Sequence, residues 1–300
     1  MRILVTGVTG QIGGALVDRL QEVATVVPAD RSALDLSRPG DIASRLDEIA
    51  PEVIVNSAAY TDVDQAECER ELAFIVNAAG PSAMARWAAR RAIPLVNLST
   101  DYVFNGNGER PWREDDAPGP LSVYGESKLA GEMEVRRAGG SHLIVRTSWV
   151  YGARGKNFLR AIAQRARECT EFNVVADEVG APTSANVVAD VLARILNRGR
   201  AQLVADFTAA GGTVHLAANG FTSRHGFATA IVDGLKARGA IVKTERVVPI
   251  QSADYPTIQT IRPRNSRLDL GRLAQVFGIT PPHWTTALES EIDQLARSIA

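Results

Sequence analysis

Two residues four positions apart, Tyr124 and Lys128, have side chains that together can perform acid–base chemistry. They lie in residues 123–136, whose pattern is helical, and a spacing of four places both on one face of a helix. A carbonyl that receives hydride becomes an alkoxide and needs a proton, which a tyrosine hydroxyl can donate. A neighbouring ammonium favours the phenolate and is expected to lower the tyrosine pKa from its ordinary value of about 10. We therefore predict that Tyr124 is an acid–base group activated by Lys128.

A further hydroxyl group lies upstream, in Ser99-Thr100-Asp101, directly after the apolar run of residues 95–98. A tyrosine and a lysine at this spacing are common on surface helices, so the pair alone indicates little. Thr100 at the end of a predicted strand changes this, because its hydroxyl can reach a substrate oxygen or the phenol. The sequence therefore predicts a catalytic set of Thr100, Tyr124 and Lys128.

Three glycines follow the first predicted strand, in the segment Thr6-Gly7-Val8-Thr9-Gly10-Gln11-Ile12-Gly13. Gly7 allows a sharp turn out of the strand, Gly10 lets backbone amides approach a pyrophosphate, and Gly13 lets the following helix pack closely on the sheet. The start of that helix offers free N–H groups and a partial positive charge to an anion. This strand–turn–helix setting predicts a dinucleotide site rather than a simple glycine turn.

The second predicted strand ends at Asp30, whose carboxylate can accept hydrogen bonds from an adenosine ribose. Arg31 beside it can instead pair with a 2′-phosphate, so NADH and NADPH both remain open as cofactors. Asp35 and Leu36 are placed to flank the adenine. At the end of the third strand follow Ala58, Ala59, Tyr60 and Thr61.

Short apolar runs alternate with helical patterns through the first half of the chain. The strands are expected at residues 3–5, 25–27, 53–55, 95–98 and 143–145, and the helices at 12–20, 41–49, 72–89 and 123–136. Apolar runs without polar alternation are typical of parallel strands that are covered on both faces. The fold class is therefore α/β, a doubly wound parallel sheet of the Rossmann type.

The second half is less regular and predicts a smaller C-terminal substrate-binding lobe. Helices are expected at residues 157–167, 185–196, 224–237 and 285–299, with a short strand at 174–175. We assign residues 1–150 to an NAD(P)-binding domain whose sheet is completed by parts of 172–219. Residues 151–171 and 220–300 are assigned to the lobe, which would lie over the carboxyl edge of the sheet, where open α/β sheets bind ligands.

The bulk properties exclude several other classes of protein. A formal net charge of −1 gives no general reason to bind nucleic acid or acidic membranes. No stretch approaches the roughly 18 apolar residues of a membrane span. Cys68 and Cys169 are far apart and are expected to be reduced thiols of a cytoplasmic protein. The four histidines have no ligand spacing, so no protein-bound catalytic metal is predicted.

The glycine pattern, the strand-end threonine and the Tyr-x-x-x-Lys resemble those of extended short-chain dehydrogenases. Within that group the chain resembles the dTDP-4-dehydrorhamnose reductase family over almost its whole length. The resemblance is carried by residues 56–67, 99–104, 123–132, 146–151, 180–183 (Gly-Ala-Pro-Thr) and 262–268 (Arg-Pro-Arg-Asn-Ser-Arg-Leu). It implies reduction by NADPH or NADH of the C4 keto group of dTDP-4-dehydro-β-L-rhamnose to dTDP-L-rhamnose, the last step of dTDP-rhamnose synthesis.

The resemblance also implies a role for individual residues. Tyr124 would be the proton donor, Lys128 its activator and a ribose ligand, and Thr100 the hydroxyl that tunes Tyr124. Thr100, Asp101 and Trp149 would contact the sugar nucleotide. The residues that would line the cofactor are Gln11, Ile12, Asp30, Asp35, Leu36, Ala59, Tyr60 and Thr61.

Two charged clusters have both a functional and a structural interpretation. Arg262, Arg264 and Arg267 can bind the substrate diphosphate through charge-assisted bonds, or can form a solvated basic turn. Asp62, Asp64 and Glu67 are explained at least as well by a solvated face or a helix start as by chemistry.

One departure from the family concerns assembly. Some members join their subunits through magnesium held by glutamates, and here those positions correspond to Ala15 and Asn186. Glu289 or Glu291 cannot build that site alone. We therefore expect a monomer or a homodimer without a magnesium bridge.

Two alternative functions remain open at this point. An epimerase or dehydratase acting on another nucleotide sugar would hold its cofactor oxidised between turnovers. A dehydratase would also need an acidic pair beside Thr100, where Asp101 is the single carboxylate. A non-catalytic regulatory subunit of the methionine adenosyltransferase type would be expected to have lost catalytic residues, whereas Thr100, Tyr124 and Lys128 are all present.

Overall fold

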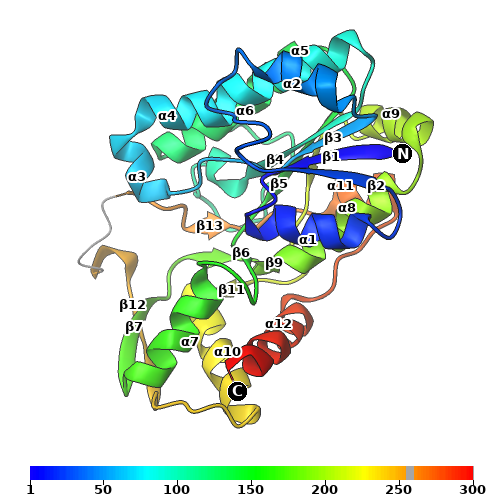
Figure 1. The fold of residues 1–300 in the computed structure, drawn as a ribbon. Coiled ribbons are helices and arrows are strands. Elements are labelled where there is room, and N and C mark those ends of the chain that lie inside the picture. Colours follow the sequence, from blue (N-terminus) through cyan, green and yellow to red (C-terminus); the bar gives the residue numbers. More distant parts are fainter. Residues whose placement is uncertain (255–259, 300) are drawn as a thin grey trace.

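A computed structural model describes residues 1–254 and 260–299 of the chain, and two regions are apparent, a sheet-bearing part and a smaller lobe (Figure 1). Residues 255–259 and residue 300, which fall in the predicted C-terminal lobe, lie outside the described residues.

The main sheet has six parallel strands in the order β10-β5-β4-β3-β1-β2. This confirms the doubly wound parallel fold. The five strands predicted in the first half are all present. Their bounds, with the sixth, are β1 Arg2–Thr6, β2 Thr25–Ala29, β3 Val53–Asn56, β4 Leu95–Thr100, β5 His142–Thr147 and β10 Thr213–His215.

Successive residues of a strand point to opposite faces of the sheet, and here both faces are apolar because both are covered by helices. Ile3 and Val5 of β1 belong to one hydrophobic cluster, and Leu4 between them belongs to another. The first cluster includes residues of α1 Gln11–Leu20, α8 Ala185–Leu196, α9 Arg200–Ala209 and α11 Gly271–Phe277. The second includes residues of α2 Ile42–Ile49, α5 Gly80–Arg90 and α6 Val123–Arg137.

The helix predicted over residues 72–89 is interrupted. The chain forms α3 Val63–Cys68, α4 Arg70–Phe74, a π-helical turn η1 Ile75–Ala79, and then α5. Pro81 in the first turn of α5 has no N–H to donate to the carbonyl of Asn77 four residues earlier, so the regular ladder cannot continue. The Asn77 carbonyl oxygen lies so close to α6 that a Cβ on Gly131 would be 2.0 Å from it. This interruption therefore allows close packing against the helix that carries Tyr124.

The smaller lobe has its own apolar core, which includes Tyr151, Phe227 and Trp284. Its helices are α7 Phe158–Glu168, α10 Arg224–Ala237 and α12 Trp284–Ile299, beside the parallel pair β7 Glu171–Val175 and β12 Arg246–Ile250. Short strands connect it to the sheet-bearing part (Figure 1): β6 Val150–Tyr151, β8 Val179–Gly180, β9 Thr183–Ser184, β11 Thr222–Ser223 and β13 Asn265–Ser266. Two 3-10 turns complete the fold, η2 Asp101–Val103 and η3 Ser252–Asp254.

Part of the segment assigned to the lobe packs elsewhere. Leu273 and Phe277 of α11 and Ile279 after it lie in the core beneath the sheet. Helices α9 and α11 are additions to the predicted elements. Among the described residues, no helix combines the length and the apolar character needed to cross a membrane.

Candidate active site at the carboxyl ends of the strands

The structure brings Thr100, Tyr124 and Lys128 together between β4 and α6. The phenol of Tyr124 interacts with the hydroxyl of Thr100, which donates to Asp101 Oδ1 at 3.1 Å. Lys128 is buried and its Nζ donates to the carbonyl of Leu98 at 2.6 Å. A hydroxyl, a phenol and an ammonium therefore meet at the carboxyl end of a central strand.

Small and capping residues set the position of α6. The Ser122 hydroxyl accepts a hydrogen bond from Gly125 N at 3.2 Å and caps the helix. A Cβ at Gly125 would lie 2.3 Å from the carbonyl oxygen of Tyr102, so only glycine allows this approach. A carboxylate oxygen of Glu67 accepts from the N–H of Val123 at 2.9 Å and holds the first turn of the helix. Glu67 thus has a structural role at a helix start.

The expected lowering of the Tyr124 pKa is not found. Burial raises the pKa of this phenol above its ordinary value, and the hydrogen bond with Thr100 opposes that effect. The prediction was wrong because the Lys128 ammonium is bound by the carbonyl of Leu98 rather than by the phenol. A raised pKa nevertheless suits a proton donor, because it keeps the phenol protonated until a stronger base forms beside it.

Asp101 and Trp149 lie beside this group. Burial raises the pKa of Asp101 to about 6, although hydrogen bonds from Ser266 and Thr100 oppose the shift. Asp101 Oδ2 is buried without a partner in the described residues. Trp149 has a φ of +48°, a conformation that non-glycine residues adopt at a cost and that is concentrated at functional sites. A Cβ on Gly180 would lie 2.6 Å from its ring, which explains a glycine in the Gly-Ala-Pro-Thr segment.

The sequence reasoning missed Arg224. Its guanidinium lies 3.7 Å from the centroid of the Trp149 ring, and its Nε is 3.4 Å from the buried carboxylate of Glu178. The positive charge also opposes the rise in the Asp101 pKa. Arg224 is the first residue of α10, where a cation faces the positive end of the helix dipole. An arginine at the start of a predicted helix is electrostatically unfavourable, and this feature of the sequence could have indicated a functional role for Arg224.

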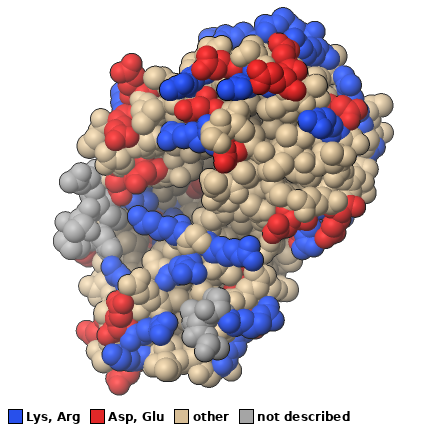
Figure 2. Space-filling view, in the orientation of Figure 1, with Lys and Arg blue, Asp and Glu red and all other residues tan. Residues whose placement is uncertain are grey.

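The three arginines Arg262, Arg264 and Arg267 lie in different environments. Arg262 reaches toward the site, with Nη1 3.4 Å from the hydroxyl of Tyr102 and Nη2 3.0 Å from Asp64. Arg264 is largely exposed, with Nε 3.5 Å from Asp177. Arg267 donates to Asn265 Oδ1 at 2.8 Å. Figure 2 shows Lys and Arg side chains gathered along the hollow between the sheet-bearing part and the smaller lobe.

The glycine turn has the geometry that an anionic diphosphate needs. Gly7 has a φ of +70°, and a Cβ on Gly13 would lie 2.2 Å from the carbonyl oxygen of Gly7. Helix α1 begins after Gly10 with no side-chain cap and no acidic residue in its first turn, so no such side chain competes with a ligand for its first N–H groups. Gln11 Oε1 is buried without a partner in the described residues. A dinucleotide phosphate fits this cradle.

At the end of β2, Asp30 Oδ1 accepts from Ser32 N, Ser32 Oγ and Ala33 N at 2.9, 2.6 and 3.1 Å, which lowers the Asp30 pKa. Asp35 similarly accepts from Ser37, and Arg31 Nε lies 3.6 Å from it. An open cavity of about 230 Å³ here is lined in part by Arg31, Asp35, Arg38 and Arg45. The end of β2 therefore carries acidic and basic side chains next to one another, and the choice between NADH and NADPH stays open.

The other predicted cofactor residues differ in exposure. Leu36 is buried and packs in the core rather than standing free at the surface. Ala58 lies against the turn, since a Cβ on Gly7 would be 2.6 Å from its nitrogen. Tyr60 donates through its hydroxyl to Glu69 at 2.8 Å and through its backbone N–H to Asn77 at 2.8 Å. Ile12 and Ala59 are partly buried and Thr61 is exposed.

Two further predictions concern metals and thiols. Over residues 1–254 and 260–299, no three His, Cys, Asp or Glu side chains are grouped to hold a metal ion. Cys68 and Cys169 are free. The Glu291 carboxylate is buried and accepts hydrogen bonds from Asn186 Nδ2 and from the N–H of Ala153, each at 2.8 Å.

Comparison with known proteins places the chain in a family. Residues 1–297 match the model described as the RmlD substrate binding domain. A dTDP-4-dehydrorhamnose reductase of Burkholderia thailandensis is 42% identical over 291 residues, which cover 96% of this chain and 97% of that protein. The crystal structure of a dTDP-4-dehydrorhamnose reductase from Bacillus anthracis in complex with NADP matches with a TM-score of 0.86 and 31% identity, over 98% of this chain and 99% of that one.

A further crystal structure supports the same assignment. The Clostridium acetobutylicum dTDP-4-dehydrorhamnose reductase has a TM-score of 0.88 and 33% identity, over 99% of this chain and 100% of that one.

The fold, the glycine cradle and the Thr–Tyr–Lys group together define an NAD(P)-dependent oxidoreductase of the short-chain dehydrogenase class. Within that class, the chain belongs to the dTDP-4-dehydrorhamnose reductase family.

Proposed function

We propose that this chain reduces the C4 keto group of dTDP-4-dehydro-β-L-rhamnose to dTDP-L-rhamnose, with Tyr124 as proton donor and NADPH or NADH as cofactor. The observation that carries the proposal is the interaction between the Tyr124 phenol and the Thr100 hydroxyl, one helical turn from the buried Lys128 amine. Family membership favours this reaction over epimerisation, dehydration or a non-catalytic regulatory role.

The cofactor, when bound, supplies the hydride for the carbonyl carbon. Tyr124 gives its proton to the carbonyl oxygen, and Thr100 holds the phenol toward that oxygen. The Lys128 ammonium is held by the Leu98 carbonyl one helical turn along α6, and from there it would add positive charge to the site as the proton leaves the phenol. Solvent protons then restore the phenol.

Each ligand is assigned to a part of the site. Gly7, Gly10, Gln11, Ile12 and Gly13 would hold the diphosphate of the cofactor. The adenosine would lie against Asp30, Asp35 and Leu36, with Arg31 placed to pair with a 2′-phosphate. Residues on the nicotinamide side would be Ala58, Ala59, Tyr60, Thr61, Tyr124 and Lys128. The dTDP-sugar would contact Thr100, Asp101, Trp149, Arg262 and Arg264, and we add Arg224 because it stacks on Trp149.

We assign the cofactor to residues 1–150 with parts of 172–219. The sugar nucleotide would bind between Thr100, Asp101 and Trp149 of that part and the lobe of residues 151–171 and 220–300, from which α11 is excepted because it packs beneath the sheet. We further propose that the enzyme acts in the cytoplasm as a monomer or as a homodimer without a magnesium bridge. The bonds from Asn186 and Ala153 to Glu291 support the absence of a magnesium bridge, because each carboxylate oxygen already accepts a hydrogen bond within the chain.

The substrate assignment is tested by following NADPH and NADH oxidation with a panel of 4-keto sugar nucleotides. We expect dTDP-4-dehydrorhamnose to give the highest kcat/KM, with the dTDP-linked sugar as product. Oxidation with none of the panel would refute the proposed reaction. Release of tightly bound NAD on denaturation, without any need for added reductant, would instead indicate an epimerase.

Reduction is expected to slow as pH rises through about 8. Burial lowers the pKa of Lys128 to about 8, although the negative charge of Glu132 opposes this shift. The charged amine that stabilises proton loss from Tyr124 is therefore present below this pH and is lost above it. The check is kcat measured from about pH 6 to about pH 10 with saturating substrates. A rate that stays constant across the alkaline range would contradict this role of Lys128.

A further inference from the structure

One face of α6 contacts three successive residues of β4. Tyr124, Lys128 and Glu132 are spaced one helical turn apart. Their partners on β4 are the Thr100 hydroxyl, the Leu98 carbonyl and the Ser99 hydroxyl. The first two contacts belong to the catalytic group described above. The third, from Ser99 Oγ to Glu132 Oε1 at 2.6 Å, joins the residue before Thr100 to the residue one turn beyond Lys128.

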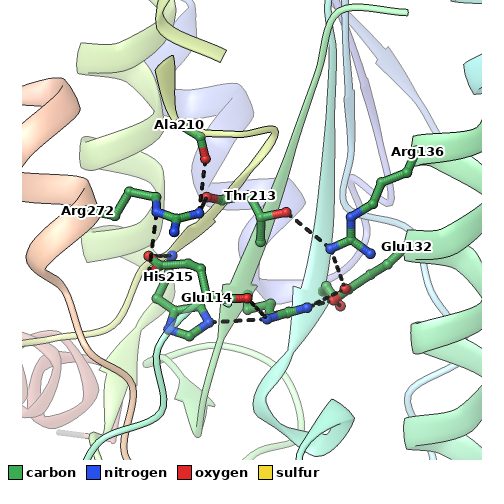
Figure 3. Close-up of polar contacts among 9 residues, drawn as sticks. Glu114, Glu132, Arg136, Ala210, Thr213, His215 and Arg272 are labelled. Atoms are coloured by element: carbon green, nitrogen blue, oxygen red, sulfur yellow. Dashed lines mark hydrogen bonds and ion pairs between the residues drawn. The ribbon is translucent and has the colours of Figure 1, made fainter. Parts of the chain in front are cut away.

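Glu132 is fully buried and its carboxylate is surrounded by donors. Arg146 on β5 donates to it through Nε at 2.9 Å and Nη2 at 2.7 Å, the bidentate geometry that fixes both side chains. Arg136 on α6 adds a bond at 3.1 Å (Figure 3). These partners hold the pKa of Glu132 below its ordinary value against the opposing effect of burial. Glu132 is therefore a fixed negative charge inside the protein.

Arg146 also contacts Glu114 and His215, which add no further positive charge beside the Glu132 carboxylate. Arg146 Nη1 also donates to the backbone carbonyl of Glu114 at 3.2 Å and lies 3.5 Å from His215 Nε2. Burial lowers the pKa of His215 to about 3, so its ring is neutral and adds no cation. The side chain of Glu114 accepts from the N–H of His215 at 3.0 Å and has Arg272 Nε at 3.8 Å (Figure 3).

We propose that Glu132 is a positioning residue for proton donation, which ties Ser99 to α6 and keeps a negative charge beside the Lys128 amine. The inference rests on the proposed function of Tyr124 and Lys128. Glu132 acts through those residues and through Thr100. Its carboxylate is buried and accepts hydrogen bonds from Ser99, Arg136 and Arg146, so it does not contact a ligand.

The electrostatic part follows from burial. An ammonium removed from water loses its hydration, so its pKa falls, and a nearby carboxylate offsets part of that loss. The Glu132 charge is what opposes the fall at Lys128. The groups that face Glu132 are Lys128 and Arg136 on α6, Arg146 on β5 and Ser99 on β4. Neutralising Glu132 leaves the cations and removes their shared partner, so Lys128 should lose its proton at lower pH.

The first measurement does not depend on activity. The lysines of the chain are Lys128, Lys156, Lys236 and Lys243, so ¹³Cε-lysine NMR gives few signals, and a Lys128→Met variant assigns the one that matters. In Glu132→Gln we expect the Lys128 pKa to fall by at least about one pH unit relative to the unmodified protein. Glu134→Gln is the matched control, because Glu134 lies on the same helix but bonds to Ser82 and Arg137; its Lys128 signal should titrate unchanged.

Kinetics provide the second measurement. Glu132→Gln should lower kcat at least about tenfold and move the alkaline limb of its pH profile downward, while Glu132→Asp should restore the limb because it restores the charge. A structural role alone would lower the melting temperature and leave the limb in place. An unmoved limb together with an unmoved Lys128 titration in Glu132→Gln would overturn the proposal.

A further variant is needed because removing one member of a buried ion pair is strongly destabilising. Ser99→Ala removes the tether and keeps the charge, so kcat should fall about threefold or more, with the KM for NADPH and the Lys128 titration unchanged. If Glu132→Gln does not melt cooperatively, the proposal is tested with Ser99→Ala. A kcat of Ser99→Ala equal to that of the unmodified protein would then contradict the proposal. Failure of the unmodified protein to oxidise NADPH would count against the proposed function, while the NMR result would still test the charge.

Discussion

Replacing Tyr124 by Phe should lower kcat by about 100- to 10,000-fold, the range that a positioned general acid contributes. The ring stays, so its edge-to-face contact with Tyr102, with centroids 5.4 Å apart, is retained. The phenolic proton and its interaction with Thr100 are lost. Single-turnover reduction and NADPH binding, measured separately, distinguish lost chemistry from lost affinity, and we expect the Kd for NADPH to change less than threefold.

Tyr151→Phe is the matched control for this prediction. Tyr151 is fully buried in the smaller lobe, and its hydroxyl has no hydrogen-bond partner in the described residues. The same loss of one oxygen there should leave kcat unchanged. If Tyr124→Phe retained more than about one tenth of the unmodified kcat, another group would have to be the proton donor.

Gly13→Ala should disrupt the cofactor site through a single methyl group. The new Cβ would lie 2.2 Å from the Gly7 carbonyl oxygen and 2.8 Å from Ser57 Oγ, far inside contact distance. Helix α1 must then move away from the glycine turn, and overpacking of this kind costs about 1–3 kcal/mol. Because its N–H groups move with it, we expect the Kd for NADPH to rise at least tenfold, at about 1.4 kcal/mol for each factor of ten.

The neighbouring glycine supplies the control for this change. A Cβ on Gly14 would lie 3.4 Å from the Val8 carbonyl oxygen, an ordinary contact. Alanine also favours a helix over glycine by about 1 kcal/mol, so Gly14→Ala should keep the affinity and maintain or raise the melting temperature. Equal NADPH titration curves for the two alanine variants would show that close packing at Gly13 does not position the binding turn.

Local sequence patterns predicted the parallel sheet correctly, and they placed Thr100, Tyr124 and Lys128 on the strand and helix where the structure has them. Strands β1, β3 and β5 each contain a continuous run of buried apolar residues because both faces of the sheet are covered there, and this signal needs no tertiary information. The spacing of Tyr124 and Lys128 is likewise set by one helix. Thr100 could be assigned to the same site because it ends a parallel strand, and open α/β sheets bind their ligands at the carboxyl ends of the strands.

Contacts between distant segments could not be predicted in the same way. The π-helical turn at Ile75–Ala79 depends on Pro81 locally, but its packing depends on Gly131, about fifty residues away. Arg224 and Trp149 meet through the arrangement of the smaller lobe. The acidic residues near Asp62 also needed the structure, which shows Asp62 capping α3 through Gln65 N at 3.1 Å and Glu67 holding α6.

The amino-acid sequence by itself determined which residues are available for chemistry and on which elements they lie, because helix and strand periodicity is local. The tertiary structure alone decided their ionisation. The pKa of Tyr124 is raised rather than lowered, and that of Lys128 is lowered to about 8. Burial and the partners from β4 and β5 set both shifts, and these are properties of the environment that the folded chain builds around each group.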